Sequence, residues 1–138
     1  MWLPWKRLRI PILYYHEIGP DRSKHVVSPG AFQEQMAWLE DAGFEVLALD
    51  DVVEIYGGRR SAPARAVALT FDDGRSGVAR HALPILGRRG WPATLFLVTG
   101  WLDGGEIPAA ERYSGFLSWP EVRSLHGAGF AVGSHTVT

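Results

Sequence analysis

The chain of 138 residues contains no cysteine. This absence excludes disulfide bonds, thiolate metal sites and cysteine nucleophiles. The sequence also lacks an excess of either charge, because 14 lysine and arginine residues balance 15 aspartate and glutamate residues and leave a net charge of −1. A nucleic-acid-binding surface needs a concentration of positive charge, so no nucleic-acid partner is predicted.

Long apolar runs are missing as well. No stretch approaches the roughly 18 apolar residues that a membrane-spanning helix requires, so no membrane span is predicted. At the N-terminus the charges of Lys6 and Arg7 follow the apolar residues instead of preceding them, and no sustained apolar region comes next. We therefore expect no signal peptide in this chain. Residues 1–9 are assigned as an N-terminal segment and residues 10–138 as one domain.

Apolar residues make up 46% of the chain and charged residues 21%, as in ordinary globular proteins. Short apolar runs rich in strand formers alternate with amphipathic segments, which predicts an α/β fold with about five parallel strands and intervening helices. The predicted strands span residues 10–15, 44–49, 65–71, 93–98 and 130–133. The predicted helices span residues 29–41 behind the cap Ser28, 50–56 with Asp50 as the cap, 75–89 with a kink at Pro84, and 118–126. Residues 19–29 and 100–116 are predicted loops.

Two adjacent carboxylates, Asp72 and Asp73, follow the apolar run 66–71 and precede Gly74. Like charges at the end of a buried strand are unfavourable unless a metal ion or a catalytic role compensates for them. The alternative interpretation is an Asp-Asp-Gly turn that carries two solvated charges.

His16 and His135 also follow predicted strands. Because ligands of parallel sheets bind beyond the carboxyl ends of the strands, we expect both histidines near Asp72 and Asp73. His135 is a candidate metal ligand. His16 is a candidate pocket residue, with a packing histidine as the alternative. Trp101, in the loop after the fourth strand, is a candidate for stacking on a sugar ring.

The segment Thr70-Phe71-Asp72-Asp73-Gly74 resembles the first motif of the polysaccharide deacetylases, carbohydrate esterase family four. Ser134-His135-Thr136 resembles the start of that family's second motif. The resemblance extends from about residue 10 to residue 138 and includes four further segments: Tyr15-His16, Leu83-Pro84-Ile85-Leu86, Ala93-Thr94-Leu95-Phe96-Leu97 and Ser118-Trp119.

This resemblance implies a partial (β/α) barrel and a metal-dependent hydrolase that removes acetyl groups from N-acetylated or O-acetylated carbohydrate. Asp73 and His135 would be metal ligands, zinc would be the metal, and Asp72 would be the general base. The implied partner is an acetylated polymer or oligomer, and the implied place of action is outside the cell or in its envelope.

The family's second motif has a further histidine four residues after His135, at position 139, and its later motifs also lie past Thr138. We therefore expect this chain to be the N-terminal part of a deacetylase domain. A non-catalytic carbohydrate-binding or interaction fragment is the first alternative. A phosphatase or phosphotransferase with an aspartate nucleophile is the second. Such sites commonly place their two aspartates one residue apart, whereas Asp72 and Asp73 are adjacent, and no glycine-rich phosphate loop follows here.

Overall fold

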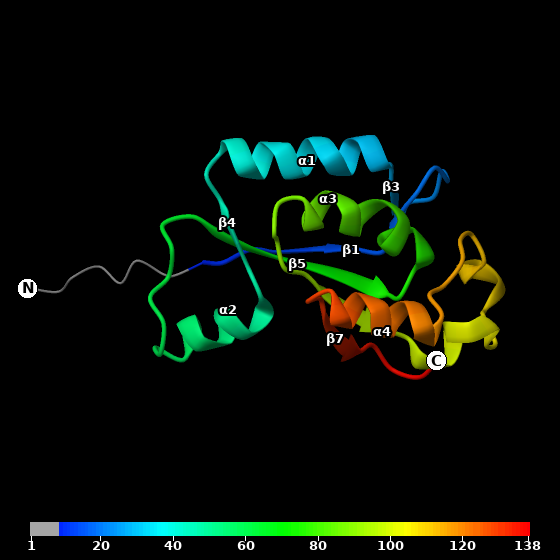
Figure 1. The fold of residues 1–138 in the computed structure, drawn as a ribbon. Helices are drawn as coiled ribbons and strands as arrows, with labels where there is room; N and C mark the ends of the chain where they lie inside the picture. The colour runs from blue at the N-terminus through cyan, green and yellow to red at the C-terminus, as the bar shows by residue number, and fades with distance from the viewer. Residues whose placement is uncertain (1–8) are drawn as a thin grey trace, which may run out of the picture.

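The computed structural model describes residues 9–138, so the predicted segment 1–9 lies outside the described residues except for Arg9. A parallel sheet of five strands runs through the centre of the molecule (Figure 1). Its strands are β1 (Ile12–Tyr15), β4 (Glu45–Leu47), β5 (Ala66–Asp73), β6 (Thr94–Leu97) and β7 (Ala131–Ser134). The prediction of an α/β fold with about five parallel strands is confirmed.

Strand β5 is the central strand, and it pairs with one strand along one edge and with two strands along the other. Ala68 pairs with Ile12 of β1 and also with Leu47 of β4, so these two strands lie along opposite edges of β5. The main-chain N–H of Glu45 donates to the carbonyl of Arg65, and that of Val98 donates to the carbonyl of Asp73. Carbonyl groups that are an even number of residues apart in a strand point to the same edge, and these two are eight residues apart. Strands β4 and β6 therefore follow one another along a single edge of β5.

The sheet is open among residues 9–138, with the order β1-β5-β6-β7 and β4 beside the first half of β5. In this described part of the chain the sheet does not close into a barrel. The outer strands β1 and β7 each pair with a single described strand.

Within residues 9–138, four α-helices accompany the sheet: α1 (Pro29–Asp41), α2 (Leu49–Tyr56), α3 (Leu83–Gly87) and α4 (Trp119–Gly127). Helix α1 begins behind Ser28, whose hydroxyl accepts a hydrogen bond from the N–H of Ala31 at 3.2 Å, as predicted. Helix α4 begins with the reciprocal hydrogen bonds of a capping box between Ser118 and Glu121. Asp50 lies in the first turn of α2, whose N-cap is Ala48, so the prediction of Asp50 as the cap was wrong.

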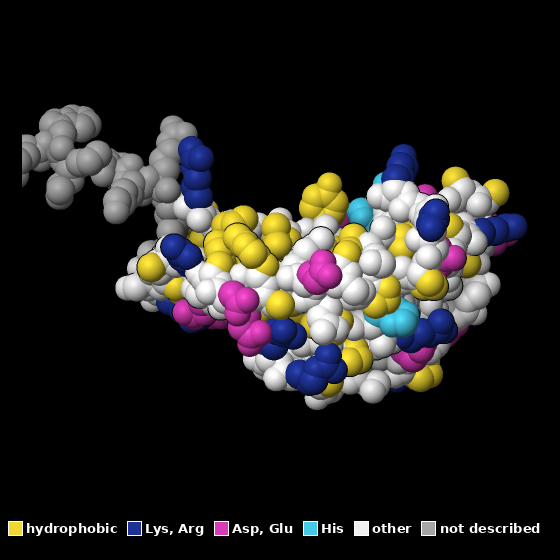
Figure 2. All heavy atoms as spheres, turned by 90° about the horizontal axis from the view of Figure 1, so that it is seen from above, with side chains coloured by type: hydrophobic (Ala, Val, Ile, Leu, Met, Phe, Trp, Pro, Cys, Tyr) yellow, Lys and Arg dark blue, Asp and Glu magenta, His cyan; other side chains and the backbone are white. Residues whose placement is uncertain are grey.

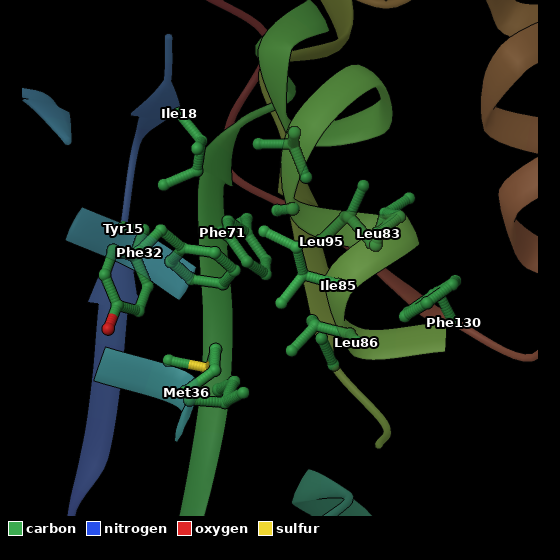
Figure 3. Packing of buried hydrophobic residues seen from close by; sticks show 14 of the residues in the cluster. Tyr15, Ile18, Phe32, Met36, Phe71, Leu83, Ile85, Leu86, Leu95 and Phe130 are labelled. Atoms are coloured by element: carbon green, nitrogen blue, oxygen red, sulfur yellow. The ribbon is translucent and has the colours of Figure 1, made fainter. Parts of the chain in front are cut away.

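Alternate residues of β5 pack against different helices. Val67, Leu69 and Phe71 face the larger apolar cluster, which also contains Phe32 and Met36 of α1 (Figure 3). Helices α1 and α3 cover this face of the sheet, and α2 covers part of the opposite face (Figure 1). There, Ala66 and Ala68 join a smaller cluster with residues of α2.

The segment predicted as one helix over residues 75–89 is divided in the structure. Arg75 is not helical and forms an isolated antiparallel bridge with Phe116. A π-helical turn, Val78–Ala82, precedes α3, and the N–H of Leu83 donates to the carbonyl of Val78. The next residue, Pro84, has no N–H to donate. The widened turn therefore ends just before the first turn of α3, which contains this proline.

The predicted loops contain short regular elements that hydrophobic patterns do not reveal. In the first loop, β3 (Val26–Val27) pairs in parallel with β2 (Glu17–Ile18). The second loop contains two 3₁₀ turns, Thr99–Gly104 and Ala109–Glu111. The third predicted strand continues two residues further than expected, to Asp73.

The described surface carries mixed charges. On the face seen in Figure 2, basic and acidic side chains are interspersed. Within residues 9–138, none of the helices has both the length and the apolar character needed to cross a membrane.

Candidate active site

The candidate site lies at the edge of the sheet where the parallel strands end. Asp72 and Asp73 are the last residues of β5, His16 directly follows β1, and His135 directly follows β7. The main-chain N–H of His135 donates to the carbonyl of Leu97 at 2.8 Å, which fixes the start of the last segment against the end of β6. The topology thus brings three segments that are far apart in the sequence to one edge.

Asp73 and His135 are in direct contact. Oδ1 of Asp73 lies 3.2 Å from Nδ1 of His135, although 62 residues separate them. The Asp73 side chain is 10% exposed and that of His135 is 46% exposed. The contact therefore joins a buried carboxylate to an imidazole that solvent can reach.

The backbone at the end of β5 bends at the second of the two adjacent carboxylates. In a regular strand, neighbouring side chains point to opposite faces of the sheet. Asp73 departs from this pattern because its φ is 71°, and Gly74 follows with a φ of 79°. Non-glycine residues adopt this left-handed region rarely, and aspartate is among those that tolerate it best.

Asp72 is half-buried, and its surroundings affect its ionisation. Burial raises the pKa of Asp72, the nearby His135 and His16 lower it, and the like charge of Asp73 raises it again. The influence of both histidines indicates that Asp72 lies within electrostatic range of each imidazole. A carboxylate in such a setting is suited to accept and release a proton.

His16 lines a pocket of about 300 Å³ together with residues of β1 and of the loop before α1. The centroid of its ring lies 5.9 Å from that of Tyr14 and 5.0 Å from that of His25. Tyr14 is 68% exposed. Aromatic and imidazole rings therefore line this pocket.

Trp101 has different neighbours from His16. Its ring packs edge-on against Phe116, with 5.3 Å between the centroids. Phe116 in turn lies against the guanidinium of Arg75. Trp101 is thus connected to the carboxylates through Phe116 and Arg75, whereas His16 belongs to the pocket on β1.

Sequence reasoning missed Arg75, which it assigned to the first turn of a helix. Arg75 is completely buried, and its guanidinium lies between the carboxylates of Asp73 and Glu111. The one sequence signal for a role of Arg75 was its position directly after the Asp-Asp-Gly turn. Its contact with Glu111 could not be foreseen, because Glu111 is 36 residues away in the sequence.

The donor atoms of Asp73 and His135 suit a zinc ion. Zinc accepts carboxylate oxygen and imidazole nitrogen at about 2.0–2.2 Å in a tetrahedral arrangement, which places neighbouring donors roughly 3.3 Å apart. The 3.2 Å between Oδ1 and Nδ1 is close to that separation. A catalytic zinc site uses three protein ligands. Residues 9–138 provide no group of three histidine, cysteine, aspartate or glutamate side chains that could hold a metal.

The fold and the site together define an α/β protein with carboxylate and imidazole groups at the carboxyl edge of a parallel sheet. A family model described as Polysaccharide deacetylase matches residues 59–138, more than half of the sequence. The chain belongs to the polysaccharide deacetylase family.

Individual relatives agree with this assignment. A poly-β-1,6-N-acetyl-D-glucosamine N-deacetylase of Escherichia coli K12 is 29% identical over 134 residues, which cover 88% of this chain and 20% of that protein. The structure of IcaB from Ammonifex degensii matches with a TM-score of 0.83 and 29% identity, over 93% of this chain and 53% of that one. Streptococcus pyogenes deacetylase PplD, solved in complex with acetate, matches with a TM-score of 0.79 and 26% identity, over 95% of this chain and 57% of that one. The chain therefore spans about half the length of these solved relatives and a fifth of the Escherichia coli protein.

Proposed function

We propose that this chain takes part in the hydrolysis of acetyl groups from an N-acetylated polysaccharide. The observation that carries the proposal is the placement of Asp72 beside the contact between Asp73 and His135 at the carboxyl edge of the sheet. Relatives that act on poly-β-1,6-N-acetyl-D-glucosamine support a polymer of N-acetylglucosamine as the substrate class.

Asp73 and His135 would hold a divalent cation, for which zinc is the best chemical match. When bound, the ion would supply a positive charge that activates a water molecule and favours the negative charge that develops on the acetyl oxygen. A further ligand would have to complete the set, because the described residues provide two.

Asp72 is proposed as the general base. Its half-buried carboxylate would accept the proton of the attacking water and later release it. Burial raises its pKa, so its conjugate acid is less acidic than that of an exposed aspartate, and the carboxylate is a correspondingly better base. The neighbouring imidazoles act in the opposite direction and favour the ionised form that a base requires.

His16 is proposed to line the substrate pocket and to interact with the leaving amine. It lies within electrostatic range of Asp72, from a different strand than His135. An imidazole is the side chain best suited to donate a proton near neutral pH. Replacement of His16 by glutamine tests this role through the pH dependence of turnover.

A non-catalytic carbohydrate-binding role is the second candidate, favoured by the presence of two ligands instead of three among residues 9–138. The deciding experiment incubates the purified chain and its Asp72→Asn variant with Zn²⁺ and oligomers of N-acetylglucosamine, and measures acetate release. Acetate release that depends on Asp72 supports the enzyme. Oligomer binding by NMR without acetate release supports the binding role.

A further inference from the structure

Arg75 is a charged side chain that the proposed chemistry does not use, although it lies two residues after Asp73. Its side chain has no exposed surface. A buried guanidinium is strongly unfavourable unless anions and hydrogen-bond acceptors compensate for the lost water. The contacts of Arg75 therefore indicate what the residue does.

Two carboxylates from different segments compensate for this charge. Nη2 of Arg75 lies 3.5 Å from Oδ2 of Asp73 and also forms an ion pair with the carboxylate of Glu111. Nη1 donates to the main-chain carbonyl of Glu111 at 2.7 Å and to the hydroxyl of Ser114 at 3.4 Å. The guanidinium thus connects the end of β5 to the segment around residues 111–114.

Aromatic rings enclose the same guanidinium. Its central carbon lies 4.0 Å from the centroid of the Tyr113 ring and 4.3 Å from that of Phe116. A planar guanidinium can stack on rings and donate hydrogen bonds within its plane at the same time, which the compact ammonium of lysine cannot do. The site is therefore specific for arginine and not merely for positive charge.

The two oxygens of Asp73 have different partners. Oδ1 lies 3.2 Å from the ring of His135, and Oδ2 lies 3.5 Å from Arg75. With Oδ2 directed at the guanidinium, Oδ1 remains the oxygen available beside the imidazole. Partners that orient a metal-binding side chain in this way commonly change metal affinity by about 10–100-fold when they are removed.

We propose that Arg75 is a positioning residue that fixes the carboxylate of Asp73 for metal binding through Oδ1 and connects this ligand to segment 111–116. This inference rests on the proposed metal site at Asp73 and His135. It adds a residue that does not touch the substrate and acts through Asp73.

The test measures Zn²⁺ affinity of the whole chain by calorimetry, with circular dichroism to establish the folded fraction. Arg75→Met and Arg75→Lys are expected to weaken Zn²⁺ binding about tenfold or more, and Arg88→Met, at an exposed position, is the control expected to bind like the wild type. The ring ¹⁵N shifts of His135 are expected to change in both Arg75 variants and not in Arg88→Met.

Unchanged affinity in a folded Arg75→Met chain overturns the proposal. If that variant does not fold, Arg75→Lys decides: full affinity with lysine means that charge alone suffices and overturns the positioning role. Asp73→Asn separates this inference from the proposed function. If Asp73→Asn binds Zn²⁺ like the wild type, the metal site itself is wrong; if it loses binding while the Arg75 variants keep it, the role of Arg75 alone is wrong.

Discussion

Gly77 leaves the space that the buried carboxyl group of Glu17 occupies. A Cβ atom at position 77 would overlap Oε1 of Glu17 and the carbonyl oxygen of Ile18. Glu17 is 2% exposed, and its Oε1 accepts a hydrogen bond from the N–H of Ile18 at 2.9 Å. The absence of a side chain at residue 77 is therefore what allows β2 to pack against the turn that precedes α3.

Gly77→Ala is expected to destabilise the chain, because neither the carboxyl group nor the main-chain carbonyl can move freely. Overpacking of this kind typically costs about 1–3 kcal/mol of unfolding free energy. Urea denaturation followed by circular dichroism measures the effect. Gly87→Ala is the matched control, since a Cβ atom there meets no neighbour within 4 Å. Equal unfolding midpoints for the two variants would contradict the packing argument.

Glu17 is expected to make the stability of the chain depend on pH. Burial raises the pKa of Glu17, and hydrogen bonds from Ser114 and Ile18 together with Arg75 and His81 oppose this shift without cancelling it. Since the folded state then binds the proton more tightly than the unfolded state, this stabilisation is complete below the unfolded pKa and is lost as pH rises through the folded pKa. Glu17→Gln cannot ionise, so its stability relative to the wild type should increase between about pH 4 and neutral pH. A difference that stays constant over this range rules out the raised pKa.

Ser118 stabilises the start of α4 through its capping box. Its N–H and hydroxyl donate to Oε2 of Glu121 at 2.7 and 2.8 Å, and these two bonds lower the pKa of Glu121. Ser118→Ala should reduce the free energy of unfolding by about 1 kcal/mol. Ser124→Ala, at an exposed position inside the same helix, is the control and should have little effect. Similar losses in both variants would show that the cap is unimportant.

Asp72→Asn is expected to reduce acetate release from N-acetylglucosamine oligomers by about 10²–10⁴-fold, the usual contribution of a general base. The Zn²⁺ affinity of this variant should change less than that of Asp73→Asn, because Asp72 is proposed to act on the water and not on the ion. Asp50→Asn, at an exposed position of α2, is the control and should retain full turnover. Equal turnover in Asp72→Asn and the wild type would remove Asp72 from the mechanism.

The fold was largely predictable because local signals determine it. Apolar runs define the strands, and Ser28 and Ser118 define the starts of α1 and α4. The end of the third strand was misplaced because the strand continues through the polar residues Asp72 and Asp73, which pair with β6. Apolar pattern alone cannot identify the end of a strand whose last residues are charged.

The candidate site was predictable in part because the order of strands and helices could be predicted. The rule that parallel strands end at one edge correctly brings Asp73 and His135 near each other, but it gives no distance. The burial of Arg75 could not be predicted, since all of its partners except Asp73 come from a loop that has no hydrophobic period. His16 and Trp101 lie in different surroundings because they follow different strands, β1 and β6.

The left-handed backbone at Asp73 has a consequence for protein engineering. Copying an aspartate pair onto the tip of another parallel strand would leave the two carboxylates on opposite sides of the new sheet, with only one of them able to enter a shared pocket. A successful transplant would have to include the reversal of φ at the second aspartate and the glycine after it. The segment to transfer is therefore defined by its backbone conformation as much as by its two aspartates.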